Sequence, residues 1–209
     1  MPLSKAHTLE VARRRRQDKI IFGGMLIGAI LSLVASFVLS IEAVVLAGNP
    51  DANLACNVNL ILNCATVALH PSAELLGFPN SFLGLMAESV VITVAVSGLS
   101  GVKFPRPFMF AAQIGYGLGL VFAWYLFTIS FFVIQALCPW CLLVTLTTTL
   151  VFFTISRYNI RENNLYLSEK VHARLYDWIE KGYDVVLLAS IVVAVVAAIT
   201  LKYGEAIFI

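Results

Sequence analysis

The sequence predicts an all-α integral membrane protein with five membrane-spanning helices, and three observations support this fold class. Hydrophobic residues make up 60% of the 209 residues, whereas charged residues make up only 12%. The mean hydropathy is +0.89. The 50 residues 107–156 contain no charged side chain. A soluble domain of this length would expose more charge, so the composition excludes a water-soluble globular protein.

Segments long enough to cross a bilayer recur along the chain. About 20 apolar residues span the hydrocarbon core as a helix, and this criterion gives the predicted spans 20–45, 81–99, 108–132, 138–156 and 184–201. The third and fourth spans are separated at Cys138-Pro139, because proline is well suited to the first turn of a helix. The fourth helix is therefore expected to begin at this pair.

The first span is expected to be a retained membrane anchor. Its uncharged stretch, 20–41, has 22 residues, whereas the apolar region of a signal peptide has about 7–15. The following residues, Val45-Leu46-Ala47-Gly48, form a poor cleavage site.

Lysine and arginine in short loops mark the side of the membrane that faces the cytoplasm. Six of the 14 lie in the tail 1–19, two in 100–107 and five in the connector 157–183, while 46–80 and 133–137 contain none. Thirteen of the 14 thus fall on alternate loops, as five spans with a cytoplasmic N-terminus require. Residues 46–80 then form an outward capping loop, and both cysteine pairs face outward.

These assignments make the chain a single membrane domain, 1–209. Within the cytoplasmic connector, 168–182 carries apolar residues at helical spacing with lysine and arginine between them: Val171, Leu175, Trp178 and Ile179. The segment is either a helix lying on the membrane surface or a connector helix packed on the bundle.

Two of the four cysteines form the motif Cys138-Pro139-Trp140-Cys141. At a helix start, the Cys138 sulfur would lie near unpaired backbone amides, and these donors and the helix dipole stabilise a thiolate. A lowered thiol pKa is the usual property of a redox-active C-x-x-C pair. Zinc sites also use C-x-x-C, but a four-cysteine site usually takes two such pairs, whereas Cys56 and Cys64 are eight residues apart. No metal site is predicted.

Cys56 and Cys64 lie in the outward loop, where disulfides persist. One interpretation is a structural bridge that holds the long loop. The other is a shuttle pair that takes electrons from soluble thiol proteins and passes them to Cys138 and Cys141 by thiol–disulfide exchange. The second interpretation gives the membrane-edge pair an electron source.

The electron acceptor is expected to be a membrane quinone of the menaquinone or ubiquinone type. The sequence has no Rossmann or phosphate-binding loop for a soluble nicotinamide, whereas a lipid-soluble quinone can reach the pair laterally. Aromatic residues near the outer end of the third span would suit the walls of a quinone site, although aromatics at this depth are also ordinary interface anchors: Trp124, Tyr125, Phe127, Phe131 and Phe132.

Taken together, these motifs resemble those of the vitamin K epoxide reductase family in its bacterial form. The resemblance rests on the spacing of Cys56 and Cys64, on Gly77-Phe78-Pro79-Asn80-Ser81-Phe82-Leu83-Gly84 and on the C-x-x-C motif, and it covers about 56–156. It implies a four-helix bundle around a quinone, a peripheral fifth helix and a location in the bacterial inner membrane. Bacterial relatives often continue into a fused thioredoxin-like domain. Only 202–209 follows here, so we expect the partner to be a separate extracytoplasmic thioredoxin-fold protein.

The resemblance also implies a role for each cysteine. Cys141 would sit beside the quinone and pass electrons to it. Cys138 would exchange with the loop pair through Cys64, while Cys56 would meet the external partner.

Three further residues are predicted to bind the quinone: Asn80, Trp124 and Thr145. By the resemblance, Asn80 would hydrogen-bond a quinone carbonyl, although asparagine is also a good N-cap for the helix that follows. Thr145 stands four residues after the last cysteine, where relatives that act on vitamin K often carry tyrosine. This difference favours quinone reduction over epoxide reduction.

Three other polar residues receive no role. Glu88 lies about two turns into the second span, where a buried acid is costly enough to suggest a function. A proton route and a hydrogen bond to a neighbouring helix are both open for it. Glu42 is expected to be solvated near the outer interface, and His70 lies in the capping loop.

The predicted function is that of a membrane thiol:quinone oxidoreductase that reoxidises a thioredoxin-fold protein and so supports disulfide formation in exported proteins. One alternative is a vitamin K epoxide reductase driven by an external thiol reductant. Another is a membrane adaptor or transporter with structural disulfides. The unrelated quinone-coupled disulfide oxidases share a four-helix plan, but their C-x-x-C lies in the first outward loop. No nucleic-acid partner is predicted.

Overall fold

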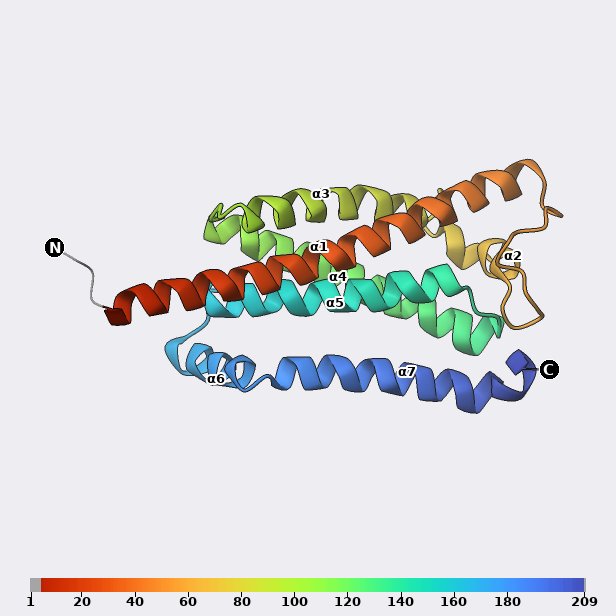
Figure 1. Ribbon diagram of the computed structural model, residues 1–209. Coiled ribbons are helices and arrows are strands. Elements are labelled where there is room, and N and C mark those ends of the chain that lie inside the picture. The colour runs from red at the N-terminus through yellow and green to blue at the C-terminus, as the bar shows by residue number, and fades with distance from the viewer. Residues whose placement is uncertain (1–4, 209) are drawn as a thin grey trace.

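The structure, a computed structural model, describes residues 5–208 and is built from α-helices (Figure 1). The long helices are α1 (Lys5–Gly48), α3 (Ser81–Leu99), α4 (Arg106–Thr128), α5 (Pro139–Arg161) and α7 (Tyr183–Phe208). The short elements are α2 (Cys64–Ala68), the 3₁₀-helix η1 (Pro71–Glu74), the π-helix η2 (Ile129–Ile134) and α6 (Glu169–Glu180). Five helical segments are long and apolar enough to cross a membrane. This result confirms the predicted all-α membrane fold.

Helix α1 begins earlier than the predicted first span. It starts in the basic tail, at Lys5, and the side chain of Arg13 reaches Glu180 of α6 with an N–O distance of 2.8 Å. The prediction rested on hydropathy, which identifies only the apolar part of this helix. Lysine, arginine and glutamate are good helix formers, so the polar residues extend it without a break.

Helix α1 packs along both α3 and α5, and α4 packs on α5. A buried core of aliphatic side chains surrounds Phe22, whose ring lies 4.9 Å from that of Tyr158. Close approach of α1 and α5 depends on a small residue at Gly28, because a Cβ there would lie 2.7 Å from Val151 Cγ2. Small residues at helix contacts are a common means of packing membrane helices.

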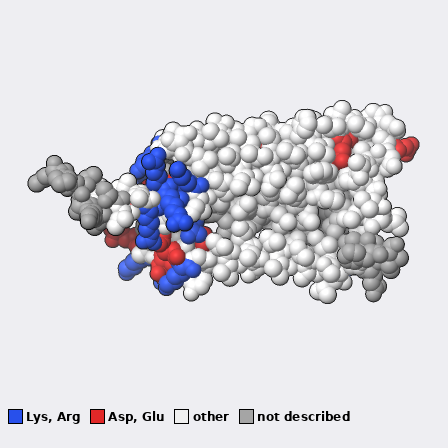
Figure 2. All heavy atoms as spheres, viewed as in Figure 1, with Lys and Arg blue, Asp and Glu red and all other residues white. Residues whose placement is uncertain are grey.

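Charged residues gather at the end of the bundle where α1 begins (Figure 2). There Arg157 of α5 pairs with Asp184 of α7 at 2.8 Å, and the buried Arg161 pairs with Asp18 of α1. These ion pairs join three long helices at one end. Helix α7 otherwise lies outside the bundle, where it contacts α5 and α6.

Helix α6 is packed on the bundle. Its Ile179 is buried, and the Ile179 carbonyl accepts a hydrogen bond from Arg157 at 3.0 Å. Val171 and Tyr176 remain exposed on the same helix. The predicted helix is therefore present and has the contacts of a connector helix.

The chain changes direction between α4 and α5 through the π-helix η2 and Gln135, which has a left-handed φ of 58°. Helix ends leave carbonyl groups without intrahelical donors. Here the carbonyl of Phe131 accepts hydrogen bonds from Lys202 and from Tyr203 Oη, both on α7. Helix α7 thereby holds the segment that leads into the C-x-x-C motif.

Candidate functional site

The capping loop is shaped by a disulfide and by asparagine side chains. Cys56 and Cys64 are joined, with their Cα atoms 5.7 Å apart. Asn59 Oδ1 accepts the backbone N–H groups of Ile61 and Leu62, and Asn63 Oδ1 accepts that of Thr66 and caps α2. Asparagine often closes turns in this way. These contacts place Cys64 at the first position of α2.

A single parallel β-bridge, Leu62 with Leu137, connects the capping loop to the C-x-x-C segment. Leu137 donates its N–H to the Ile61 carbonyl at 2.6 Å, and its own carbonyl accepts the N–H of Asn63 at 3.1 Å. Each of these two backbone strands leads directly into a cysteine. Cys64 and Cys138 consequently share one buried cluster and are 1% and 2% exposed.

Helix α5 begins at the C-x-x-C motif, as the sequence predicts. Cys138 is the N-cap, and its sulfur accepts the N–H of Cys141 at 3.3 Å. Both cysteines carry free thiols. Cys138 lies just before the membrane span Pro139–Arg161. The Cys141 side chain first, and then the backbone N–H groups of Cys141 and Trp140, lower the pKa of the Cys138 thiol, although burial and the charge of Glu42 oppose them.

A cavity of about 570 Å³ opens inside the bundle beside these sulfurs. Cys64, Cys138 and Cys141 all contribute to its wall, and most of the other lining residues are apolar side chains of α1, α3, α4 and α5. A largely apolar cavity with a few polar groups is the usual form of a small-molecule site. The predicted residues Asn80 and Thr145 also line it.

Asn80 sits at the start of α3, but its side chain does not cap the helix. Its Nδ2 donates to the Ser72 carbonyl at 2.7 Å and thus ties the capping loop to α3. The buried Oδ1 has no hydrogen-bond partner among the described residues. The alternative role of Asn80 as a side-chain N-cap is therefore wrong. Thr145 donates to the Cys141 carbonyl at 3.0 Å.

The aromatic residues of the third span separate into different environments. Phe127 lines the cavity. Trp124 is absent from the described lining, and its Nε1 donates to Thr149 at 3.1 Å. Tyr125 and Phe132 are 49% and 63% exposed, as interface anchors would be. The predicted role of Trp124 in quinone binding stays a prediction.

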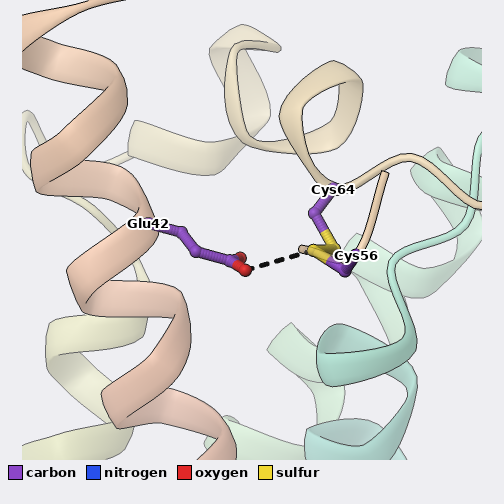
Figure 3. A group of neighbouring side chains, drawn as sticks. All are labelled: Glu42, Cys56 and Cys64. Carbon is purple, nitrogen blue, oxygen red and sulfur yellow. Dashed lines mark hydrogen bonds between the residues drawn. A yellow bond between two sulfur atoms is a disulfide. The ribbon is translucent and has the colours of Figure 1, made fainter. Parts of the chain in front are cut away.

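Glu42 is buried beside the loop disulfide, which contradicts the expectation that it is solvated. It is 7% exposed, and its Oε1 lies 3.1 Å from Cys56 Sγ (Figure 3). The expectation was wrong because position along α1 does not reveal that the capping loop folds back over this turn. In the part of the chain that the structure describes, Oε2 of Glu42 has no hydrogen-bond partner.

Glu88 is a second buried acid near the site. It is 3% exposed, it lines the cavity, and its Oε1 accepts a hydrogen bond from Tyr116 Oη of α4 at 2.9 Å. Its Oε2 has no partner. Glu88 forms a hydrogen bond to a neighbouring helix and also borders the cavity. A role in a proton route therefore stays a prediction.

One trio among the described residues, Glu42, Cys56 and Cys64, has ligand atoms within 4.8 Å of one another. The two sulfurs are bonded to each other and offer no thiolate, so the trio is not a metal site in this state.

Several residues that build the site were not found from the sequence. The asparagines Asn59 and Asn63 carry a local signal, because Asn precedes each turn at the spacing of an Asx motif. Glu42 and Leu137 carry none, because their contacts join segments that are distant along the chain.

Comparison with known proteins agrees with this site. The sequence model of the Vitamin K epoxide reductase family matches residues 24–156, which include all four cysteines, Asn80 and the cavity-lining parts of α3, α4 and α5. No curated protein matches the chain. Members of the family are oxidoreductases, and quinones serve in general as their electron acceptors. By this match over more than half of its length, the chain belongs to the vitamin K epoxide reductase family and is a membrane oxidoreductase.

Proposed function

We propose that this protein is a thiol:quinone oxidoreductase that reoxidises a thioredoxin-fold protein on the outer side of the inner membrane. Electrons enter at Cys56 and Cys64, move to Cys138 and Cys141 and leave to a quinone. The observation that carries the proposal is the common cavity wall of Cys64, Cys138 and Cys141. A disulfide serving only to hold the loop would not need to share this cavity with a free C-x-x-C pair.

The cysteines have separate tasks in this scheme. Cys64 is the member of the loop pair that lines the cavity, so it exchanges with Cys138, which belongs to the same buried cluster. Cys138 is a good leaving thiolate because its sulfur accepts the Cys141 N–H. Cys56 lies outside the described cavity lining and meets the external partner. Since Cys56 is 8% exposed, the loop opens for that encounter.

The residues around the cavity fit a quinone. The wall is mainly apolar, as a hydrophobic ring and its tail require, and Asn80 Oδ1 and Glu88 Oε2 are buried with no hydrogen-bond partner among the residues that the structure describes. Such orphaned polar atoms are costly unless a ligand pairs with them. When bound, a quinone supplies a two-electron acceptor. A quinone carbonyl only accepts hydrogen bonds, so a protonated Glu88 would donate to it, whereas Asn80 Oδ1 would accept from a hydroxyl of the reduced quinol. Cys141 lies at the cavity wall.

Replacing Cys141 tests the proposal. Purified protein is mixed with a reduced thioredoxin-fold protein that carries one C-x-x-C site and with a short-tailed ubiquinone or menaquinone, and quinone absorbance is followed. Cys141→Ala should abolish turnover, because no second thiol remains to complete a disulfide with Cys138. Ser97→Ala, at a half-buried site on α3 outside the described cavity lining, is the matched control and should keep wild-type turnover. Turnover by Cys141→Ala would contradict the assigned order.

The same preparation separates this activity from epoxide reduction. Vitamin K epoxide and a dithiol are supplied in place of the quinone and the protein partner. Formation of vitamin K quinone at a rate comparable with quinone reduction would support the epoxide reductase alternative instead.

A further inference from the structure

The buried carboxyl group of Glu42 has no structural partner that explains it. Its side chain points from α1 toward the loop disulfide (Figure 3), and its nearest polar contact is Cys56 Sγ at 3.1 Å. No ion pair holds Glu42 among the described residues, and its Oε2 has no hydrogen-bond partner. A buried carboxyl group without a partner is expensive. Because the carboxyl group lies beside a sulfur atom, a chemical role that involves this sulfur would explain its position.

The contact changes its nature with the redox state of the loop pair. In the disulfide, Cys56 Sγ carries no proton and cannot donate to Glu42. In the dithiol, the Cys56 S–H can donate to Oε1 at the same distance. The other titratable groups around this sulfur are Cys64 on α2 and Cys138 and Cys141 on α5, all in one buried cluster. None of these is a carboxylate, so Glu42 is the base of the cluster.

We propose that Glu42 is a catalytic base that removes the proton from the Cys56 thiol when the loop disulfide is re-formed. This inference rests on the proposed function, because it concerns the exchange between the loop pair and the C-x-x-C pair. General bases must lie within hydrogen-bond reach of the proton that they remove, and the distance of 3.1 Å meets this condition for a sulfur donor.

The step begins from a mixed disulfide between Cys64 and Cys138, with Cys56 as a thiol. The proton passes from Cys56 Sγ to Glu42 Oε1, and the Cys56 sulfur attacks Cys64 Sγ. The Cys56–Cys64 bond forms while the Cys64–Cys138 bond breaks, and the electron pair leaves on Cys138. The loop pair is oxidised by two electrons, and the C-x-x-C pair is reduced by two. The departing Cys138 thiolate is received by the Cys141 N–H.

An ordinary thiol is only a few per cent ionised near pH 7, and the thiolate is the attacking species. Removing the base should therefore slow disulfide formation about 10-fold to 100-fold, within or just below the 10²–10⁴-fold range typical of general base catalysis.

The test follows thiol states during one oxidation. Fully reduced protein is mixed with a short-tailed quinone, quenched with acid at intervals and alkylated with a maleimide of high mass, so that gel shifts and mass spectrometry report each disulfide. Glu42→Gln should form Cys56–Cys64 about 10-fold to 100-fold more slowly at pH 7 and accumulate the Cys64–Cys138 species. At pH 9.5 the gap should narrow to less than three-fold, because hydroxide then ionises the thiol.

Asp51→Asn is the matched control, since Asp51 is an exposed acid in the same region, and it should behave like the wild type. Formation of the loop disulfide by Glu42→Gln at the wild-type rate at pH 7 would overturn the inference. A slowing of Glu42→Gln that is equal at both pH values would also overturn it, because a damaged fold would slow the step at every pH. Elution of Glu42→Gln as a single species on gel filtration verifies its fold.

A failure of the proposed function gives a different result from a failure of the role of Glu42. If the quinone leaves all four wild-type thiols reduced, quinone reduction is wrong, and Glu42 is then tested by the same comparison with diamide as the thiol oxidant. Loop disulfide formation at equal rates in the wild type and Glu42→Gln under diamide would overturn the role of Glu42.

Discussion

The reactivity of the site depends first on one sulfur atom, that of Cys138. It sits at the N-cap of α5, where the first backbone N–H groups of the helix have no intrahelical acceptor. The Cys141 side chain and these amides lower the pKa of the Cys138 thiol in spite of its burial. Lowering the pKa of a thiol raises the fraction of thiolate at a given pH and makes the sulfur a better leaving group.

This shift predicts the pH dependence of alkylation. In a Cys56→Ser/Cys64→Ser background, the rate of Cys138 modification by N-ethylmaleimide should reach half of its plateau below the pH of an ordinary thiol, because the thiolate persists to lower pH. Cys141→Ala should move that midpoint upward, since the largest stabilising contact is lost. Mass spectrometry of the peptide containing Cys138 measures the rate. A midpoint that Cys141→Ala leaves unchanged would contradict the assigned cause.

At the residue scale, the sequence predicted the helix start at the C-x-x-C motif but not the contacts of the neighbouring side chains. The proline after Cys138 and the spacing to Cys141 are local signals, so the helix start was predicted correctly. The side chain of Asn80 donates to Ser72 and caps nothing, because the loop folds back onto α3. Glu42 meets Cys56 from 14 residues away, across a loop whose path no local pattern describes.

At the scale of elements, hydropathy predicted the existence and order of all five spans but not their ends. The span Ser81–Leu99 was predicted to the residue, whereas α1 runs on to Lys5 and α4 continues into the π-helix η2. The length of an apolar stretch predicts the part of a helix that lies in lipid, but it does not predict how far the helix extends into polar residues. The turn at Gln135 and the hydrogen bonds from α7 to Phe131 depend on tertiary contacts, and these cannot be predicted from the hydropathy pattern.

Contact between α1 and α5 provides a test of this packing. Gly28→Ala should destabilise the protein by about 1–3 kcal/mol, because the new methyl group would meet Val151 and force the helices apart. Gly23→Ala, in the same helix, is the control, since a Cβ there meets nothing within 4 Å. It should be neutral or slightly stabilising, because alanine is the better helix former. Thermal unfolding of the detergent-solubilised protein, monitored by gel filtration, measures both. Equal midpoints for the two variants would argue against a close contact at Gly28.

At the scale of the whole molecule, most lysine and arginine residues lie at one end of the bundle and the four cysteines lie at the other. Lysine and arginine gather where α1 begins (Figure 2), while the capping loop and the start of α5 form the other end (Figure 1). Ion pairs such as Arg157 with Asp184 fix the basic end. Positive charge is retained on the cytoplasmic side during membrane insertion. By this rule we expect the basic end to face the cytoplasm and both cysteine pairs to face the oxidising side, where disulfides persist.

This orientation is testable with single cysteines placed on two loops. The background is Cys138→Ser/Cys141→Ser, which keeps the Cys56–Cys64 disulfide and so adds no free thiol. Asp51→Cys should react with a membrane-impermeant maleimide in intact cells, because Asp51 is exposed in the loop that follows α1. Lys103→Cys, exposed in the loop after α3, should react only after lysis, because one further span separates the two loops. Labelling of Lys103→Cys in intact cells would show that the topology is the reverse of the one predicted. The cysteines would then face the reducing compartment, and outward disulfide formation would have no chemical basis.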